Sequence, residues 1–68
     1  MNEFQEIALE KLGELCRLLP EQRLGQIIYN YLLSELPNAD PFFIQDKNLL
    51  NILEKNVKKI EKMLDNKN

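Results

Sequence analysis

The same apolar repeat occurs near both ends of this 68-residue chain, with spacings of four, four, three and four residues. The two sets are Phe4, Ala8, Leu12, Leu15 and Leu19, and then Leu49, Leu53, Val57, Ile60 and Leu64. Spacings of three and four bring side chains onto one face of an α-helix. The repeats therefore predict two amphipathic helices, at about 3–18 and 47–64, each of which buries one stripe of side chains.

Three prolines divide the rest of the chain. Pro20 and Pro37 bound a segment that predicts another helix at about 21–36, because proline does not continue a helix and restricts the residue before it. From Leu24 to Leu33 this segment has no charged residue. A helix that is apolar over most of its circumference is buried on several sides. We therefore expect it to be the central helix, covered by the other two, with room for a second chain.

The connection between the second and third helices, residues 37–46, contains the third proline. Asp40 is expected to cap one helical turn that begins at Pro41, because aspartate caps helix N-termini and proline suits the first position. Three large apolar side chains follow, Phe42, Phe43 and Ile44. We expect at least two of them to close the end of the core, and we expect Asp46 to cap the third helix.

These elements predict an all-α fold, a small three-helix bundle with a short helical turn before the last helix. Residues 1–68 should form one domain, because a chain of this length builds a single core, and residues 65–68 should fray. A core of this size is only marginally sufficient for stability. We therefore expect a homodimer, in which a second copy covers the spare apolar area of the second and third helices.

The residue types in the chain argue against catalysis. It has no histidine and a single cysteine, Cys16, so it offers neither a Ser-His nor a Cys-His pair. We expect Cys16 to pack as a small apolar side chain. The sequence also lacks the glycine-rich loops that hold phosphates. The chain is therefore expected not to be an enzyme and to need no metal and no cofactor.

The N-terminal segment is acidic and amphipathic. A secretory signal needs a basic start and a continuous apolar stretch instead. The apolar runs of the chain are also shorter than a membrane span, and a lone cysteine suits a reducing compartment. We therefore expect a cytoplasmic protein with no membrane segment.

A narrow polar strip lies on the otherwise apolar second helix. It consists of Arg23, Gln26 and Asn30. Polar groups that are buried without partners are costly, so these side chains should find hydrogen bonds. In one interpretation they form a structural clasp on the backbone of the connection, around Asp40, Pro41, Phe42 and Phe43. In the other, these seven residues form a recognition site for a partner protein.

Asn56 interrupts the wide apolar stripe of the third helix. An asparagine in such a stripe can set the register of a helical dimer, at some cost in stability. In this interpretation the oligomer interface consists of Ile52, Asn56, Ile60 and Met63. Alternatively, Asn56 lies at the edge of the stripe and points to water.

The strip and the proline turn together resemble a group of small bacterial proteins of no assigned activity, with relatives in phage genomes. Over residues 23–50 the pattern is Arg-x-Gly-Gln, two apolar residues, a spacer and Asn, and then Asp-Pro-Phe with an aromatic or apolar residue. The matching residues are Arg23, Gly25, Gln26, Asn30, Asp40, Pro41, Phe42 and Phe43. Tyr31 departs from the alanine that is usual there. The resemblance implies a compact helical protein in which the strip and the turn act as one unit, and it implies no ligand.

The charge distribution leaves two functional hypotheses. Residues 1–46 carry three basic and eight acidic side chains, whereas residues 47–68 carry six lysines and three acids. The first hypothesis is a non-catalytic interaction module, a homodimer that binds or modulates a cytoplasmic protein through an apolar groove or its acidic face. The second is a nucleic-acid-associated accessory protein that uses Lys55, Lys58, Lys59 and Lys62. A net charge of −2 argues against nucleic acid, because phosphate binding needs clustered cations.

Overall fold

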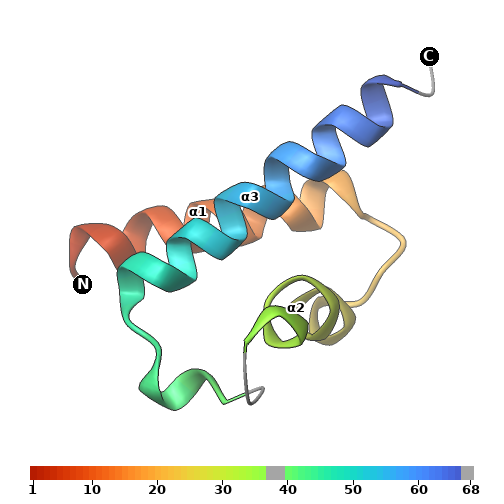
Figure 1. Cartoon of the computed structure of the whole chain (residues 1–68). Helices are drawn as coiled ribbons and strands as arrows, with labels where there is room; N and C mark the ends of the chain where they lie inside the picture. The colour runs from red at the N-terminus through yellow and green to blue at the C-terminus, as the bar shows by residue number, and fades with distance from the viewer. Residues whose placement is uncertain (37–39, 67–68) are drawn as a thin grey trace.

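The computed structural model describes residues 1–36 and 40–66. Within these residues it contains three α-helices, α1 (Glu3–Leu18), α2 (Leu24–Tyr31) and α3 (Asp46–Asp65). Two short 3-10 helices, η1 (Leu33–Glu35) and η2 (Pro41–Phe43), lie between α2 and α3 (Figure 1). No strand occurs in this described part of the chain. The predicted all-α fold, with three helices and a short helical turn before the last, is confirmed.

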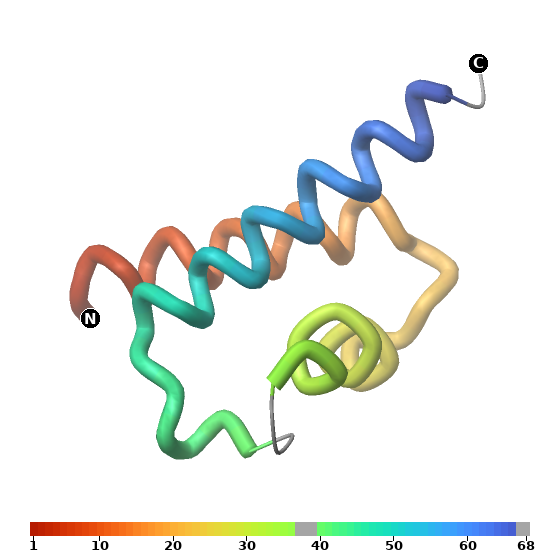
Figure 2. Tube along the Cα trace, in the orientation of Figure 1, coloured from red at the N-terminus to blue at the C-terminus, as the bar shows by residue number. Residues whose placement is uncertain are grey.

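α1 and α3 lie side by side and run in the same direction (Figure 1, Figure 2). Where they begin, the side-chain Nδ2 of Asn2 donates a hydrogen bond of 3.0 Å to Oδ2 of Asp46. Parallel helices cannot be joined by a tight turn, because the chain must first return along the 16 residues of α1, about 24 Å. The segment that contains α2, η1 and η2 makes this return. α2 is seen nearly end-on in Figure 1, so it crosses the α1–α3 pair instead of running along it.

Local sequence explains where α1 begins, but the cap expected for α3 is not formed. Asn2 caps α1, since its Oδ1 accepts a hydrogen bond from the Gln5 N–H at 2.8 Å and the Gln5 Oε1 accepts one from the Asn2 N–H at 3.1 Å. The bounds of α1 are as predicted, and α3 extends one residue further at each end. The expected Asp46 cap is wrong. Asp46 is the first residue of α3, and its carboxylate accepts the hydrogen bond from Asn2 instead.

The middle helix is much shorter than the predicted 21–36, which is therefore wrong. After α1 the chain turns, with the Gln22 N–H donating to the Leu19 carbonyl oxygen, and Arg23 is extended. These residues change the direction of the chain, so they cannot form the first turn of a helix. α2 ends where Leu32 leaves the helical conformation, at φ −131° and ψ −65°.

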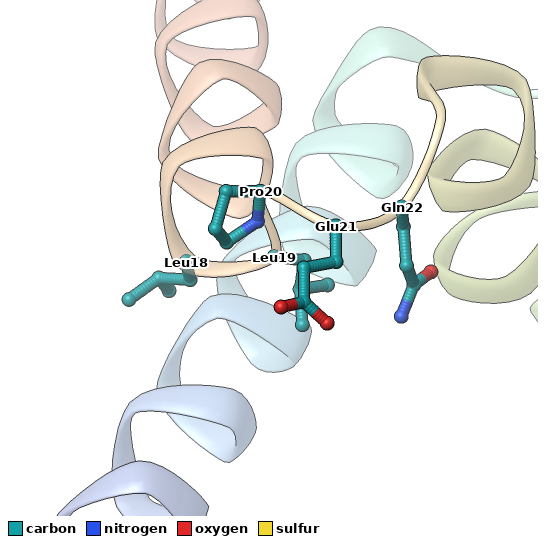
Figure 3. A pocket seen from close by; sticks show the side chains of 5 residues that line it. All are labelled: Leu18, Leu19, Pro20, Glu21 and Gln22. Atoms are coloured by element: carbon teal, nitrogen blue, oxygen red, sulfur yellow. The ribbon is translucent and has the colours of Figure 1, made fainter.

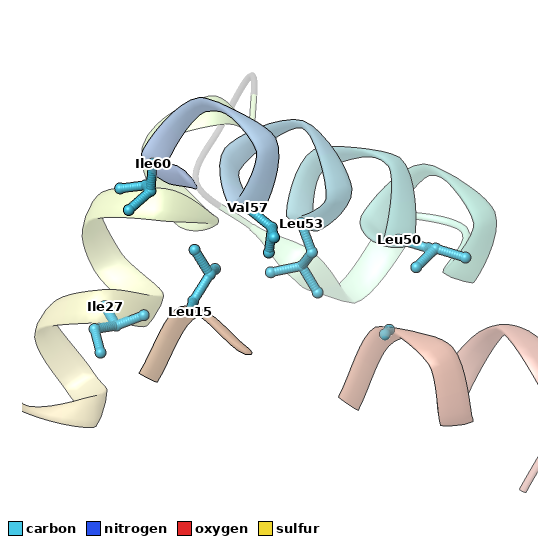
Figure 4. Packing of buried hydrophobic residues seen from close by; sticks show 7 residues of the cluster. Leu15, Ile27, Leu50, Leu53, Val57 and Ile60 are labelled. Carbon is cyan, nitrogen blue, oxygen red and sulfur yellow. The ribbon is translucent and has the colours of Figure 1, made fainter. Parts of the chain in front are cut away.

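The core lies between α1 and α3, and α2 closes one end of it (Figure 4). The buried apolar cluster consists of Ala8 and Leu15 from α1, Ile27 from α2, and Leu50, Leu53, Val57 and Ile60 from α3. Ile27 is the one buried residue of α2, whereas Leu24 and Tyr29 are more than half exposed. The expectation of a central, surrounded helix is therefore wrong. A helix of eight residues that crosses a helix pair buries one face, here Ile27 with Tyr31 packed beside the core, and Leu24 and Tyr29 face solvent.

Leu15 is fully buried in this cluster, so Leu15→Ala should lower the free energy of unfolding by about 2–5 kcal/mol. A loss of that size leaves a large part of so small a domain unfolded. Urea unfolding followed by far-UV circular dichroism measures it. The control variant Leu9→Ala, at an exposed position of α1, should change the free energy of unfolding by no more than about 0.5 kcal/mol. Equal stability of the two variants would contradict the described core.

Candidate functional site

The two most exposed aromatic side chains of the described residues lie next to each other in η2. Phe42 and Phe43 are each 82% exposed. The expectation that they close the end of the core is therefore wrong, and of the three apolar residues here only Ile44 is partly buried. The rings of η2, which leads into the start of α3, are left in solvent.

The backbone of this turn is held by its own residues. The Asp40 Oδ1 accepts a hydrogen bond of 2.9 Å from the Phe42 N–H, and the Ile44 N–H donates to the Pro41 carbonyl oxygen at 3.3 Å. The predicted Asp40 cap and the helical turn that begins at Pro41 are thus confirmed. We call residues 40–43 the aromatic turn.

The two rings of the aromatic turn contact each other. The ring centroids of Phe42 and Phe43 are 4.9 Å apart, and the ring planes are inclined by 75°. This is the edge-to-face geometry that aromatic pairs favour. The pair therefore forms one ordered apolar feature of the surface.

The polar strip does not reach this turn. Arg23, Gln26 and Asn30 are all exposed. The Gln26 Oε1 accepts a hydrogen bond of 2.9 Å from the Arg23 N–H, so it caps the start of α2. The Asn30 carbonyl accepts one of 2.6 Å from the Ser34 hydroxyl beyond its end. No hydrogen bond joins the strip to residues 40–46, so the expected clasp is wrong for this part of the connection, and residues 37–39 lie outside the described residues.

Asn56, not the strip, carries a buried side-chain hydrogen bond to another helix. It is 3% exposed, and its Nδ2 donates hydrogen bonds to the Tyr31 carbonyl at 2.8 Å and to the Ile52 carbonyl at 3.1 Å. Tyr31 is the last residue of α2, where carbonyl groups have no partner within the helix. Asn56 therefore fixes the end of α2 to α3.

This placement contradicts both interpretations of Asn56. It neither points to water nor lies in a dimer interface, because the fold of the single chain buries it. Ile60 belongs to the core, Ile52 is partly buried, and Met63 is exposed near the end of α3. These four residues do not form a free surface, so the predicted oligomer interface is wrong. Sequence alone signalled that Asn56 was unusual, but the Tyr31 carbonyl could not be identified as its partner.

An ion pair supports the same junction. The Lys55 Nζ lies 3.6 Å from a carboxylate oxygen of Glu35, which belongs to η1. Exposed pairs of this kind contribute little, typically less than about 1 kcal/mol. Lys58, Lys59 and Lys62 are also exposed, and their spacing places them with Lys55 on the face of α3 opposite the core. These four residues are the basic face.

A shallow pocket of about 300 Å³ lies at the turn between α1 and α2 (Figure 3). Leu18, Leu19, Pro20, Glu21 and Gln22 line it. The Gln22 Oε1 is buried and accepts no hydrogen bond. The lining combines three apolar residues with the polar side chains of Glu21 and Gln22, so it does not define one class of ligand. The sequence did not indicate it.

Two further kinds of site were sought in residues 1–36 and 40–66. No three side chains of His, Cys, Asp or Glu in these ranges come together as metal ligands would. None of the helices there has the length and apolar character that crossing a bilayer requires. The aromatic turn and the basic face are therefore the surfaces from which a function can be argued.

Asn56→Leu should destabilise the protein, because a side chain of similar size without a donor leaves the Tyr31 carbonyl buried and unpaired. We expect the free energy of unfolding to fall by about 1–3 kcal/mol, measured by urea unfolding. Asn51→Leu makes the same substitution at an exposed position of α3 and should change it by less than about 0.5 kcal/mol. An Asn56→Leu midpoint equal to or above that of the parent would mean that this hydrogen bond does not hold α2.

Comparison of the chain with protein-family models, with curated proteins and with solved structures finds no match. The resemblance of residues 23–50 to small bacterial proteins therefore stays a prediction. A function for the chain has to be argued from its own residues.

Proposed function

We propose that this chain is a small non-catalytic protein–protein interaction module that acts in the cytoplasm, forms a homodimer and binds or modulates another protein. The aromatic turn carries the proposal, because it holds two large apolar rings in solvent at one ordered place. Burying a phenylalanine side chain contributes about 1.5–3 kcal/mol, which these rings do not gain in the isolated chain. Aromatic side chains are enriched in the centres of protein interfaces.

The extent of the surface supports association. The chain exposes 5268 Å² at a mass of 8.0 kDa, whereas a compact monomer of that mass exposes about 4,450 Å². The excess of roughly 800 Å² equals the area that each partner contributes to an interface of ordinary size. The radius of gyration of 12.1 Å also exceeds the roughly 11 Å of a compact chain of this length. The molecule thus has spare surface that one interface would cover.

A non-catalytic role suits the residue types in the chain. It has no histidine to act as a base, and the thiol of Cys16 is partly buried beside the core. The resemblance of residues 23–50 to small bacterial and phage proteins is in keeping with a compact helical module from such a genome. The acidic helix α1 of this chain, with Glu6 and Glu10 exposed, is a second surface for a partner protein.

Capture experiments with the tagged chain, in an extract of the organism that makes it, test this function. The parent should retain a protein at a comparable molar amount. The double variant Phe42→Ala/Phe43→Ala should retain about tenfold less or lower, because loss of an aromatic anchor costs about 2 kcal/mol or more. The matched control Leu9→Ala removes an exposed apolar side chain from α1 and should bind like the parent.

Two results would count against the proposal. Equal capture by the parent, the double variant and Leu9→Ala would show that the aromatic turn is not the anchor. A chain that captures no protein and is also monomeric at high concentration would not be an interaction module.

The basic face favours a second candidate, a nucleic-acid-associated accessory protein. Lys55, Lys58, Lys59 and Lys62 are all exposed on it. Each phosphate contact makes the affinity for duplex DNA fall by about 0.9 logarithmic units for every tenfold rise in salt concentration. If all four lysines contact phosphates, the affinity should therefore fall about a hundredfold between 50 and 200 mM salt. Fluorescence anisotropy with labelled duplex DNA and single-stranded RNA measures this. Absence of binding at 50 mM salt, or binding that salt does not weaken, would exclude this candidate.

A further inference from the structure

We propose that the aromatic turn binds the same turn of a second copy of the chain, so that four phenylalanine rings form the centre of a two-fold symmetric dimer. This inference rests on the proposed function and names the occupant of its main surface; a captured protein would then depend on the two rings through the dimer that they hold together. Three properties of the turn support a second copy: the arrangement of its rings, its area and its charge.

The arrangement of the rings makes the patch self-complementary. A two-fold axis brings the same surface of both chains together, so that surface must fit itself. Aromatic rings have electron-rich faces and electron-poor edges. Because Phe42 and Phe43 are inclined by 75°, the pair presents both a face and an edge. After a two-fold rotation, the face of one pair can meet the edge of the other.

The area of the patch agrees with a dimer interface. An aromatic side chain buries about 150–250 Å² when it is covered. Phe42 and Phe43, each 82% exposed, therefore supply roughly 250–400 Å² per chain. That is up to about half of the roughly 800 Å² that each partner contributes to an interface of ordinary size.

The charge and order of the turn also favour pairing with itself. Asp40 is its one ionised group, and its carboxylate already accepts the Phe42 N–H. Two such turns can therefore meet through uncharged rings, without placing like charges at the centre. The hydrogen bonds from Phe42 and Ile44 hold the backbone before association, so little conformational entropy is lost when the interface forms.

Sedimentation equilibrium over a wide range of protein concentration tests the proposal. The parent and the control Leu9→Ala should change from the monomer to the dimer mass as concentration rises. The double variant Phe42→Ala/Phe43→Ala should associate at least about tenfold more weakly, because two anchors are lost. Its helical content by circular dichroism should match the parent, since the removed rings lie outside the core.

Cross-linking tests the same interface without removing a ring. In a Cys16→Ala background, Gln45→Cys places a thiol just after the aromatic turn at an exposed position. A short bis-maleimide should link two copies of this variant, and it should not link Leu9→Cys in the same background. Failure of Gln45→Cys to cross-link, or equal cross-linking of both variants, would overturn the proposed pairing even if the double variant failed to fold.

The outcomes separate this inference from the proposed function. A dimer that persists in the double variant would overturn the pairing of the turns, while self-association through another surface would remain. A parent chain that is monomeric at every concentration would also overturn the pairing. Capture of another protein that depends on Phe42 and Phe43 would then still support an interaction module.

Discussion

The hydrogen bond from Asn56 to the carbonyl of Tyr31 fixes the C-terminal end of α2 to α3. α1 and α3 are parallel, so the chain between them must return along their whole length. α2 is a short helix on that return path and buries only Ile27. A buried amide that pairs with the free carbonyl at the end of α2 adds a directional bond to the apolar contacts of Ile27 and Tyr31.

The position of α2 in turn decides which apolar residues face solvent. Because α2 crosses the helix pair and closes one end of the core, Leu15, Ile27 and Ile60 meet there (Figure 4). η2 lies away from this end of the core and leads into the start of α3 (Figure 1). Phe42 and Phe43 therefore remain outside, on a backbone held by the Asp40 cap. The surface that we propose for self-association thus lies outside the buried cluster.

Local sequence was enough for the elements whose causes are local. The spacing of apolar residues and the Asn2 cap account for α1, the apolar stripe accounts for α3 within one residue at each end, and Asp40 with Pro41 accounts for η2. Apart from the bounds of α2 and the Asp46 cap, the main errors concern contacts between distant residues. Asn56 and Tyr31 are 25 positions apart, and a helical pattern does not reveal which carbonyl a buried amide will meet. Gln26 was expected to bind the backbone of the connection. Its side chain instead caps α2 by accepting a hydrogen bond from the Arg23 N–H, three residues away.

By itself, the sequence determined the all-α class, the two long amphipathic helices and the capped turn, because each depends on spacing and capping within a few residues. Only the tertiary structure decided that α1 and α3 run parallel, that α2 is short and crosses them, and that Asn56 is a junction inside one chain. It also decided that Phe42 and Phe43 are exposed. The physical reason is that apolar residues are equally suited to a core and to an interface. Which of the two they form depends on how much of the core the other helices have already filled.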